Sequence, residues 1–289
     1  MKRERVETLP GLPKRPQDSN KGMYGHILVI AGGRGMAGAA ALVGASALRS
    51  GAGLVRVATA AEVQPTVASF EPSYMTYPLE SGEDGLIRAR PAQAILPKLL
   101  ERADVLAMGP GLGQSEEIRD LVHWVLETVQ IPMVLDADAL NMMAGQTELL
   151  GDLRHPVVIT PHPGEFARLT GRTIAEIQSD REVHAVALAQ ADNLVVVLKG
   201  ARTVVTDGTR VFVTTTGNPG MATGGAGDVL TGVIAALIGQ KLPAFEAAQL
   251  GVYVHGLAGD LARDEDGEIG MIAGDIVDSL ADAFFHLHA

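Results

Sequence analysis

A glycine-rich loop in front of an apolar helix is the segment best suited to chemistry in this chain. Residues 218–228, NPGMATGGAGD, lead directly into the mostly apolar run 229–238. Such a loop gathers free backbone N–H groups and the positive end of a helix dipole around one point, which favours an anion. We predict a phosphate site there, with the amides of Gly224, Gly225 and Gly227 as donors.

An acidic residue at an anion site needs a task of its own. Asp228 stands at the junction of the loop and the helix, where its charge would weaken phosphate binding unless it faced a hydroxyl group beside the phosphate. We therefore predict that Asp228 is the catalytic base. The alternative is structural, because aspartate is a favoured N-cap residue and glycines also mark tight turns.

The composition restricts the class of partner. The chain has 289 residues and a formal net charge of −11 at pH 7, with no long Lys/Arg cluster. Nucleic acids and anionic membranes need a basic surface, so we expect neither as a partner and predict a small-molecule ligand. The absence of cysteine excludes disulfides, thiolate zinc sites and cysteine nucleophiles.

The N-terminus carries no targeting signal that we recognise. Residues 1–21 contain six Lys/Arg and three prolines but no apolar core, so they predict a loose N-terminal segment. The longest apolar stretch, 36–48, is too short to span a bilayer. We expect a soluble, cytoplasmic protein.

Short apolar and β-branched runs alternate with helical stretches along the whole chain. Runs that are apolar on both faces are typical of a buried, mostly parallel sheet, which makes the class α/β. No linker or repeat interrupts the pattern, so we expect one domain over residues 1–289. Asp207-Gly208 predicts an edge hairpin with a type I′ turn. The runs are 26–31, 54–59, 104–109, 132–136, 156–160 and 194–199, the hairpin strands are 203–206 and 210–213, and late helices are expected at about 228–240, 243–264 and 274–286.

Glycine or polar residues follow most of these runs. In open α/β sheets, ligands bind outside the carboxyl ends of the strands, so these segments are expected on one rim. The spacing of Gly32, Gly33, Gly35 and Gly38 does not fit a dinucleotide fingerprint. The helix after them is poor in bulk, which suits either close packing or contact with a ligand, and Ala39 is its candidate for ligand contact.

Residues 160–165, TPHPGE, fix a histidine and a glutamate on one loop. Prolines on both sides of His162 restrict its direction, and Glu165 follows three residues later. Two residues are too few for a zinc site, whereas Glu165 could hold a hydrated Mg²⁺ near phosphates. The equally supported alternative is a glutamate that stabilises a helix N-terminus.

Two further strand ends carry polar residues. Residues 199–203, KGART, offer a cation and backbone amides to a nucleotide phosphate or purine, and we favour this over a plain turn because the glycine-rich loop is near in sequence. Asp136, Asp138 and Asn141 exceed what turn chemistry requires, and we interpret them mainly as support for the loops.

Taken in order, these motifs resemble the ADP- or ATP-dependent NAD(P)H-hydrate dehydratases, a family on the ribokinase-like fold. The resemblance covers nearly the whole chain, and the ordered set is far more specific than any single motif. It implies a mostly parallel central sheet with helices on both faces and an edge hairpin. The matching segments are 24–32, 36–40, 49–51, 109–113, 136–141, 160–165, 199–200, 218–228 and 254–256.

The resemblance implies a hydro-lyase of metabolite repair. Such an enzyme dehydrates the S epimer of hydrated NADH or NADPH with Mg²⁺ and a nucleotide, and in the bacterial branch ADP usually gives AMP and phosphate. A kinase-like step followed by elimination suits this reaction, because a phosphorylated hydroxyl leaves more readily than water. The positions implied to contact the hydrate are Ala39, Gly111, His162 and Asp228, and those implied to contact the nucleotide are Lys199, Gly200, Ala201, Arg202, Thr203 and Gly227.

The same resemblance implies a homotetramer and a functional link to an epimerase. We expect the epimerase to be a separate protein, because only some 25 residues precede the first predicted strand. The chain departs from most relatives at Ala226, where they have threonine, and ribokinase-like enzymes often have Asn in place of His162. We expect activity to persist, since the backbone donors and Asp228 remain.

Two other functions compete with the dehydratase. One is a kinase of the same fold that acts on a vitamin alcohol, and the other is a non-catalytic nucleotide-binding module. The loops at 109–113 and around His162 favour the hydrate over a vitamin alcohol. Asp228 beside an anion site argues against a module without catalysis.

Overall fold

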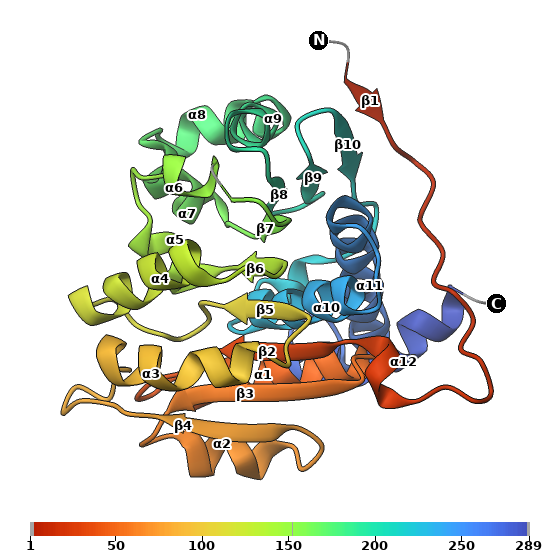
Figure 1. The fold of residues 1–289 in the computed structure, drawn as a ribbon. Coiled ribbons are helices and arrows are strands. Elements are labelled where there is room, and N and C mark those ends of the chain that lie inside the picture. The colour runs from red at the N-terminus through yellow and green to blue at the C-terminus, as the bar shows by residue number, and fades with distance from the viewer. Residues whose placement is uncertain (1–2, 152, 288–289) are drawn as a thin grey trace.

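The computed structural model describes residues 3–151 and 153–287, which form one ten-stranded sheet (Figure 1). The strand order is β1-β10-β9-β8-β7-β6-β5-β2-β3-β4. The strands are β1 (Glu4–Arg5), β2 (His26–Ile30), β3 (Leu54–Ala60), β4 (Met75–Leu79), β5 (Val105–Met108), β6 (Met133–Leu135), β7 (Val157–Ile159), β8 (Val195–Leu198), β9 (Val204–Thr206) and β10 (Arg210–Val213).

The sheet is parallel from β4 across to β8, as the apolar runs predict. Every residue of β5, β6, β7 and β8 is buried, which is expected for strands covered on both faces. Antiparallel pairing begins only at β8–β9 and continues in β9–β10, so the predicted edge hairpin is confirmed. Strands β1 and β4 form the two edges, and the sequence analysis predicts neither.

The predicted type I′ turn of this hairpin is wrong. That turn needs positive φ at both central residues, and Asp207 is absent from the described non-glycine residues with positive φ. Its carboxylate instead accepts the N–H groups of Thr209 and Arg210 at 2.9 and 2.7 Å. The Asp207 side chain therefore closes the loop. Gly208 is the loop residue with a left-handed backbone conformation.

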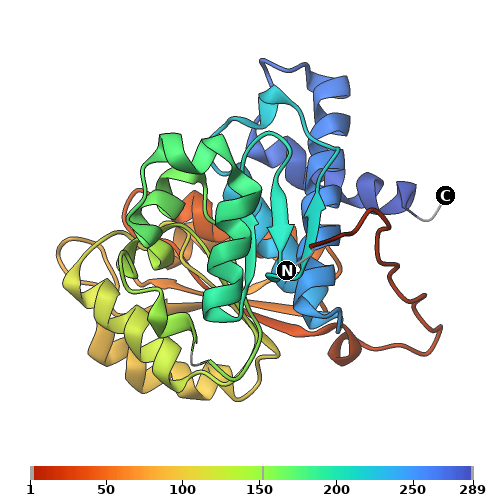
Figure 2. The ribbon, with the colours of Figure 1, turned by 90° about the horizontal axis from the view of Figure 1, so that it is seen from above.

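Helices cover both faces of the sheet in two layers (Figure 2). On one face α3, α4, α5, α7, α8 and α9 pack on one another in this order, with α6 against α9, while α1, α10, α11 and α12 pack together on the other. Among the described residues, no helix combines the length and the apolar character that a membrane crossing requires. The helices are α1 (Ala37–Arg49), α2 (Gln64–Phe70), α3 (Ala89–Leu100), α4 (Glu116–Thr128), α5 (Ala137–Met142), α6 (Glu148–Gly151), α7 (Pro163–Thr170), α8 (Ile174–Ser179), α9 (Arg181–Asp192), α10 (Ala226–Gly239), α11 (Ala244–Asp266) and α12 (Ala273–His286), with short 3-10 turns η1 (Lys21–Tyr24) and η2 (Pro219–Met221).

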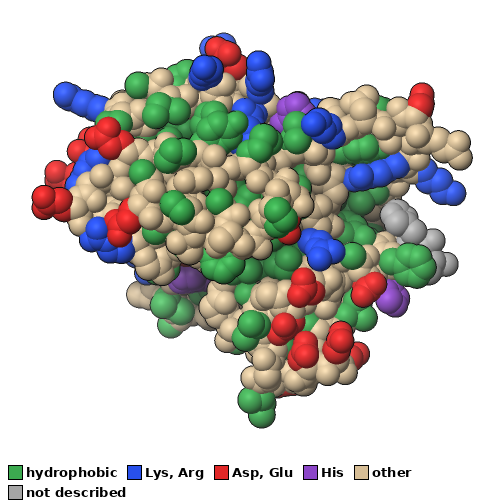
Figure 3. Space-filling model, turned by 90° about the horizontal axis from the view of Figure 1, so that it is seen from below, with side chains coloured by type: hydrophobic (Ala, Val, Ile, Leu, Met, Phe, Trp, Pro, Cys, Tyr) green, Lys and Arg blue, Asp and Glu red, His purple; other side chains and the backbone are tan. Residues whose placement is uncertain are grey.

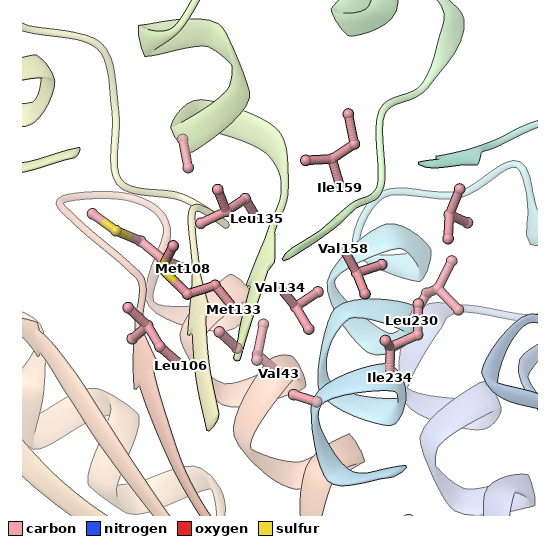
Figure 4. Packing of buried hydrophobic residues seen from close by; sticks show 14 of the residues in the cluster. Val43, Leu106, Met108, Met133, Val134, Leu135, Val158, Ile159, Leu230 and Ile234 are labelled. Carbon is pink, nitrogen blue, oxygen red and sulfur yellow. The ribbon is translucent and has the colours of Figure 1, made fainter. Parts of the chain in front are cut away.

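Helix α10 lies at the centre of the molecule and fixes the site at its N-terminus. Figure 4 shows Leu230 and Ile234 of α10 beside Val43 of α1 and the sheet residue Val158. The two helices approach each other closely at Gly232, where an added Cβ would lie 2.1 Å from the Ser46 Oγ. Small residues of α1 therefore allow α10 to pack closely against it.

The N-terminal segment crosses the molecule from β10 toward α12 (Figure 1). Strand β1 pairs with β10, and the carbonyl of Thr8 accepts a 2.8 Å hydrogen bond from the Gln249 side chain. The Arg15 guanidinium lies 3.8 Å from the ring centroid of Tyr24 and donates to the Gly51 carbonyl at 2.7 Å. These contacts attach the N-terminal segment to the rest of the fold, although the sequence predicts only a loosely held segment there.

Candidate active site

The first turn of α10 contains the glycines for which the sequence predicts an anion site. Gly225 is the N-cap residue with φ 93°, and a Cβ there would lie 2.5 Å from the Leu42 Cδ1. Only glycine fits this close left-handed turn. Within the part of the chain that the structure describes, the N–H groups of Gly224, Gly225 and Gly227 have no acceptor. They are free to bind an anion at the positive end of the α10 dipole.

A lysine whose side chain is 18% exposed lies beneath this turn. The Nζ of Lys199, at the end of β8, is 2.7 Å from the Asp136 Oδ1 and 3.8 Å from the Glu165 Oε2. A Cβ at Gly227 would lie 3.1 Å from the same Nζ, so the cation adjoins the free amides of α10. Burial disfavours the ammonium charge, but the two carboxylates outweigh burial and raise the pKa of Lys199.

Asp228 is part of the same cluster. Burial is the main cause that raises its pKa to about 7; the charge of Asp136 adds to this effect and Lys199 opposes it. A carboxyl group that titrates near neutral pH holds a proton more readily than an ordinary aspartate and remains ionised in a large share of molecules. Such a group is suited to general base catalysis.

Asp136 links β6 to α10. Its side chain is 1% exposed, and its two oxygens accept hydrogen bonds from Lys199 at 2.7 Å and from the Thr231 hydroxyl at 2.8 Å. The sequence predicts that Asp136 supports the loops, and in the structure it also holds the Lys199 ammonium beneath the first turn of α10. Asp138 supports a neighbouring loop by accepting the Gly113 N–H at 2.9 Å.

His162 and Glu165 form a capping box at the start of α7. The His162 Nδ1 accepts the N–H groups of Gly164 and Glu165 at 2.9 and 3.3 Å, and the Glu165 Oε2 accepts the His162 N–H at 2.8 Å. Burial, Lys199 and Arg168 lower the pKa of His162. The ring is therefore neutral, and because Nδ1 accepts, Nε2 carries the proton.

The loops after β2 and β5 meet beside this cluster. Gly111 has φ 64°, and a Cβ there would lie 3.0 Å from the Ala39 Cβ. The backbone of this loop therefore lies directly against the first turn of α1, and the two predicted hydrate-contact positions are neighbours. Leu86 also reaches this rim, since a Cβ at Gly113 would lie 2.6 Å from its Cδ2. The sequence offers no signal for Leu86.

His255 supports the site from behind. Its Nε2 lies 2.9 Å from the Ala226 carbonyl oxygen, and burial lowers the pKa of His255 to about 4. The imidazole is therefore neutral, and its Nε2–H donates a hydrogen bond to the Ala226 carbonyl in the first turn of α10. The sequence places His255 in the ordered set of motifs but predicts no role for it.

The comparisons with known proteins agree with this geometry. A family model described as NAD(P)H-hydrate dehydratase matches residues 27–282. The chain belongs to the NAD(P)H-hydrate dehydratase family. It is 46% identical over 271 residues to the bifunctional NAD(P)H-hydrate repair enzyme Nnr of Moorella thermoacetica, which covers 93% of this chain and 51% of that protein.

Members of the family without a second activity in their names are also similar. The ADP-dependent (S)-NAD(P)H-hydrate dehydratase of Bacillus subtilis is 37% identical over 271 residues, covering 93% of this chain and 92% of that protein. The crystal structure of the ADP/ATP-dependent NAD(P)H-hydrate dehydratase from the same organism, co-crystallised with ATP and Mg²⁺, superposes with a TM-score of 0.82 at 34% identity, covering 95% of this chain and 94% of that one. The predicted ribokinase-like α/β fold is confirmed. The chain spans about half the length of the bifunctional relatives it matches.

Proposed function

We propose that the chain dehydrates the S epimer of hydrated NADH or NADPH back to the reduced cofactor, with ADP as the phosphoryl donor. The observation that carries this proposal is Asp228, a carboxyl group with a pKa of about 7 beside the free amides of Gly224, Gly225 and Gly227. Membership of the dehydratase family and the names of the relatives support the choice of substrate.

In the first step, Asp228 takes the proton of the ring hydroxyl of the hydrate. The hydroxyl oxygen forms a bond to the terminal phosphorus of ADP, the bond from that phosphorus to AMP breaks, and AMP leaves with the electron pair. The amides of α10 and the Lys199 ammonium stabilise the negative charge of the transferring phosphoryl group.

In the second step, the phosphate ester is eliminated. The carbon–oxygen bond breaks, phosphate leaves with the bonding electrons, and the proton of the neighbouring ring carbon passes to water, so that the ring double bond is restored. We assign Ala39 and Gly111 to the wall beside the hydrate, and His162, whose Nε2 lies 3.4 Å from the Glu165 Oε1, to a contact with the hydrate. Lys199, Gly200, Ala201, Arg202 and Thr203, with Gly227, are assigned to the nucleotide.

The residues present fit a Mg²⁺ ion bound chiefly through phosphates and water. The described residues contain no group of three or more His, Cys, Asp or Glu side chains placed to hold a metal by themselves. Glu165 is a nearby oxygen donor, 6% exposed in its side chain, and we assign it a contact through water. When bound, Mg²⁺ would neutralise charge that develops on the phosphoryl oxygens.

Recovery of reduced-nicotinamide absorbance tests this function. The purified protein would be mixed with the S hydrate of NADH or of NADPH and Mg²⁺, with ADP, with ATP or without a nucleotide. Recovery that needs ADP and yields AMP and phosphate in equal amounts supports the proposal. Folded protein that binds a nucleotide but restores no absorbance with either donor would overturn it.

Substitutions at His162 distinguish its role as a helix cap from the proposed contact with the substrate. Replacing His162 with alanine removes the acceptor of α7 and is expected to lower the free energy of unfolding by about 1 kcal/mol. His162→Asn keeps a capping acceptor, so its melting temperature should stay near that of the wild type, while the KM for the hydrate rises in both variants. Thermal denaturation and steady-state kinetics measure the two effects. Equal hydrate KM values in wild type and His162→Asn would leave the residue only its capping role.

The cellular setting follows from the function. We propose a cytoplasmic enzyme that works with an NAD(P)H-hydrate epimerase, because only one epimer is its substrate and hydration gives both. Relatives named as bifunctional NAD(P)H-hydrate repair enzymes combine two activities in one chain, which supports a second repair activity beside this one.

We also propose a homo-oligomer, with a tetramer as the expected state. Figure 3 shows hydrophobic side chains on the lower surface of the molecule, where β4 is an edge strand. Met75 is 39% exposed on β4, and the Nη2 of its cross-strand neighbour Arg56 is buried without a partner among the described residues. An edge strand with exposed apolar side chains suits pairing with a second chain.

Charge on this edge is expected to weaken the assembly. Met75→Lys should reduce the mass measured by light scattering, because the second chain would have to bury an ammonium group beside Arg56. Ile174→Lys is the control, since Ile174 is 53% exposed on α8, far along the sheet order from β4. An unchanged mass for Met75→Lys would exclude the β4 edge from the interface.

A further inference from the structure

Arg181, the first residue of α9, lies against the loop that joins β8 to β9. Its Nη1 donates to the Lys199 carbonyl at 3.5 Å, and its Nη2 donates to the carbonyls of Ala201 and, at 3.2 Å, Arg202. We infer that Arg181 is a positioning residue of the nucleotide site, which holds the loop 199–203 so that its backbone N–H groups face the ligand. This inference rests on the proposed assignment of that loop to the nucleotide.

The orientation follows from peptide geometry. In a trans peptide, the carbonyl of one residue and the N–H of the next point in opposite directions. Three carbonyls turned toward Arg181 therefore turn the N–H groups of Gly200, Arg202 and Thr203 away from it. None of these three N–H groups has an acceptor within residues 3–151 and 153–287. The loop thus presents a row of free donors, which suits phosphate or purine acceptors.

The loop backbone is shaped around the guanidinium. Gly200 has φ 146°, and a Cβ there would lie 2.3 Å from the Arg181 Nη1. Arg202 is one of four described non-glycine residues with positive φ, at 59°. The Thr203 hydroxyl closes the loop by donating to the Gly200 carbonyl at 3.0 Å. A glycine at position 200 therefore does two things: it permits the backbone angle and leaves room for Arg181.

The charge of Arg181 is not neutralised by a carboxylate. No described acidic side chain forms an ion pair with it, and its hydrogen bonds go to carbonyl oxygens. Carbonyl dipoles satisfy its donors and leave its unit charge in place beneath the loop. That charge lies on the opposite side of the loop from the free amides, where it adds to their attraction for an anion.

Nucleotide affinity and kinetics with both substrates test this role. Arg181→Met is expected to raise the nucleotide Kd and the nucleotide KM by about 10- to 100-fold with the KM for the hydrate within twofold of wild type. Arg181→Lys keeps the charge but not the forked donors, so an intermediate loss is expected. Arg119→Met is the matched control, because Arg119 is exposed on α4.

A second variant covers the case in which Arg181→Met does not fold. Gly200→Ala leaves the guanidinium in the chain but pushes it from the loop, and the same selective loss of nucleotide affinity is expected. The Kd is measured by calorimetry without the hydrate, so the result does not depend on the dehydratase activity. A nucleotide Kd within twofold of wild type in a folded variant, or an equal loss for both substrates, would overturn the inference.

Discussion

Asp228→Asn is expected to lower kcat by about 10²- to 10⁴-fold, because the amide cannot accept the proton of the substrate hydroxyl. The nucleotide Kd should change little, since the free amides of Gly224, Gly225 and Gly227 belong to the backbone. Steady-state turnover and calorimetry on the same preparation measure the two quantities. Turnover within a few-fold of the wild type would remove Asp228 from the role of base.

The pH profile gives an independent measure of the same group. Because burial raises the pKa of Asp228 to about 7, kcat/KM of the wild type should rise with pH through that value. The sign for stability is opposite: a carboxyl group whose folded pKa exceeds its unfolded pKa stabilises the fold at low pH and loses this contribution as pH rises. Asp228→Asn is therefore expected to melt at an equal or higher temperature than the wild type above about pH 7.

This comparison excludes unfolding as the cause of lost activity. If the Asp228→Asn variant melts at a lower temperature than the wild type above neutral pH, the Asp228 carboxylate of the wild type must have a structural partner. The described residues show no hydrogen bond to the Asp228 side chain, which is why we expect none. The acid limb should also disappear from the residual activity of the variant.

The sequence predicts the central sheet because its signal is local. Strands buried on both faces need continuous apolar runs, and β2, β3 and β5 to β8 have them. Strand β4, with the sequence MTYPL, contains Pro78 and is half exposed, so it gives no such pattern. Strand β1 has two exposed residues and exists only through its pairing with β10.

The site divides in the same way. The anion loop and Asp228 are adjacent in sequence, so their chemistry can be inferred from one segment. The pairing of Lys199 with Asp136 joins positions 63 residues apart. Taken alone, each residue is equally well explained by a structural role in its own loop. Arg181 contacts the loop 199–203 from a helix whose sequence has no motif. Such roles depend on which strand ends become neighbours, and only the fold supplies that.

Lys199→Met is expected to have the second large effect, on stability as well as on turnover. Lys199 is the cation between Asp136 and Glu165, whose side chains are 1% and 6% exposed. Removing one partner of a buried ion pair leaves an uncompensated charge and costs about 3–5 kcal/mol. Loss of a donor to the phosphoryl group should also lower kcat by about 10²- to 10³-fold. Chemical denaturation and steady-state kinetics measure the two effects.

The direction of the pH dependence identifies the cause of the lost stability. Burial already raises the pKa of Glu165 and the charge of Lys199 lowers it, so removing the lysine raises this pKa further and the variant regains stability as pH falls. A loss of stability that is the same at about pH 5 and about pH 8 would contradict this account. Lys241→Met is the matched control: Lys241 pairs with Asp104 at 3.1 Å on the surface and should change stability by less than about 1 kcal/mol.

The double variant Lys199→Met/Asp136→Asn separates the effect of Lys199 on stability from its effect on turnover. Neutralising Asp136 removes the more buried of the two unpaired charges, so much of the lost stability should return, while turnover should stay low because the cation is still absent. Asp136→Asn alone should move the acid limb of kcat/KM to lower pH, since the charge of Asp136 helps to raise the pKa of Asp228. Recovery of turnover in the double variant would mean that Lys199 only balances the carboxylates and takes no part in phosphoryl transfer.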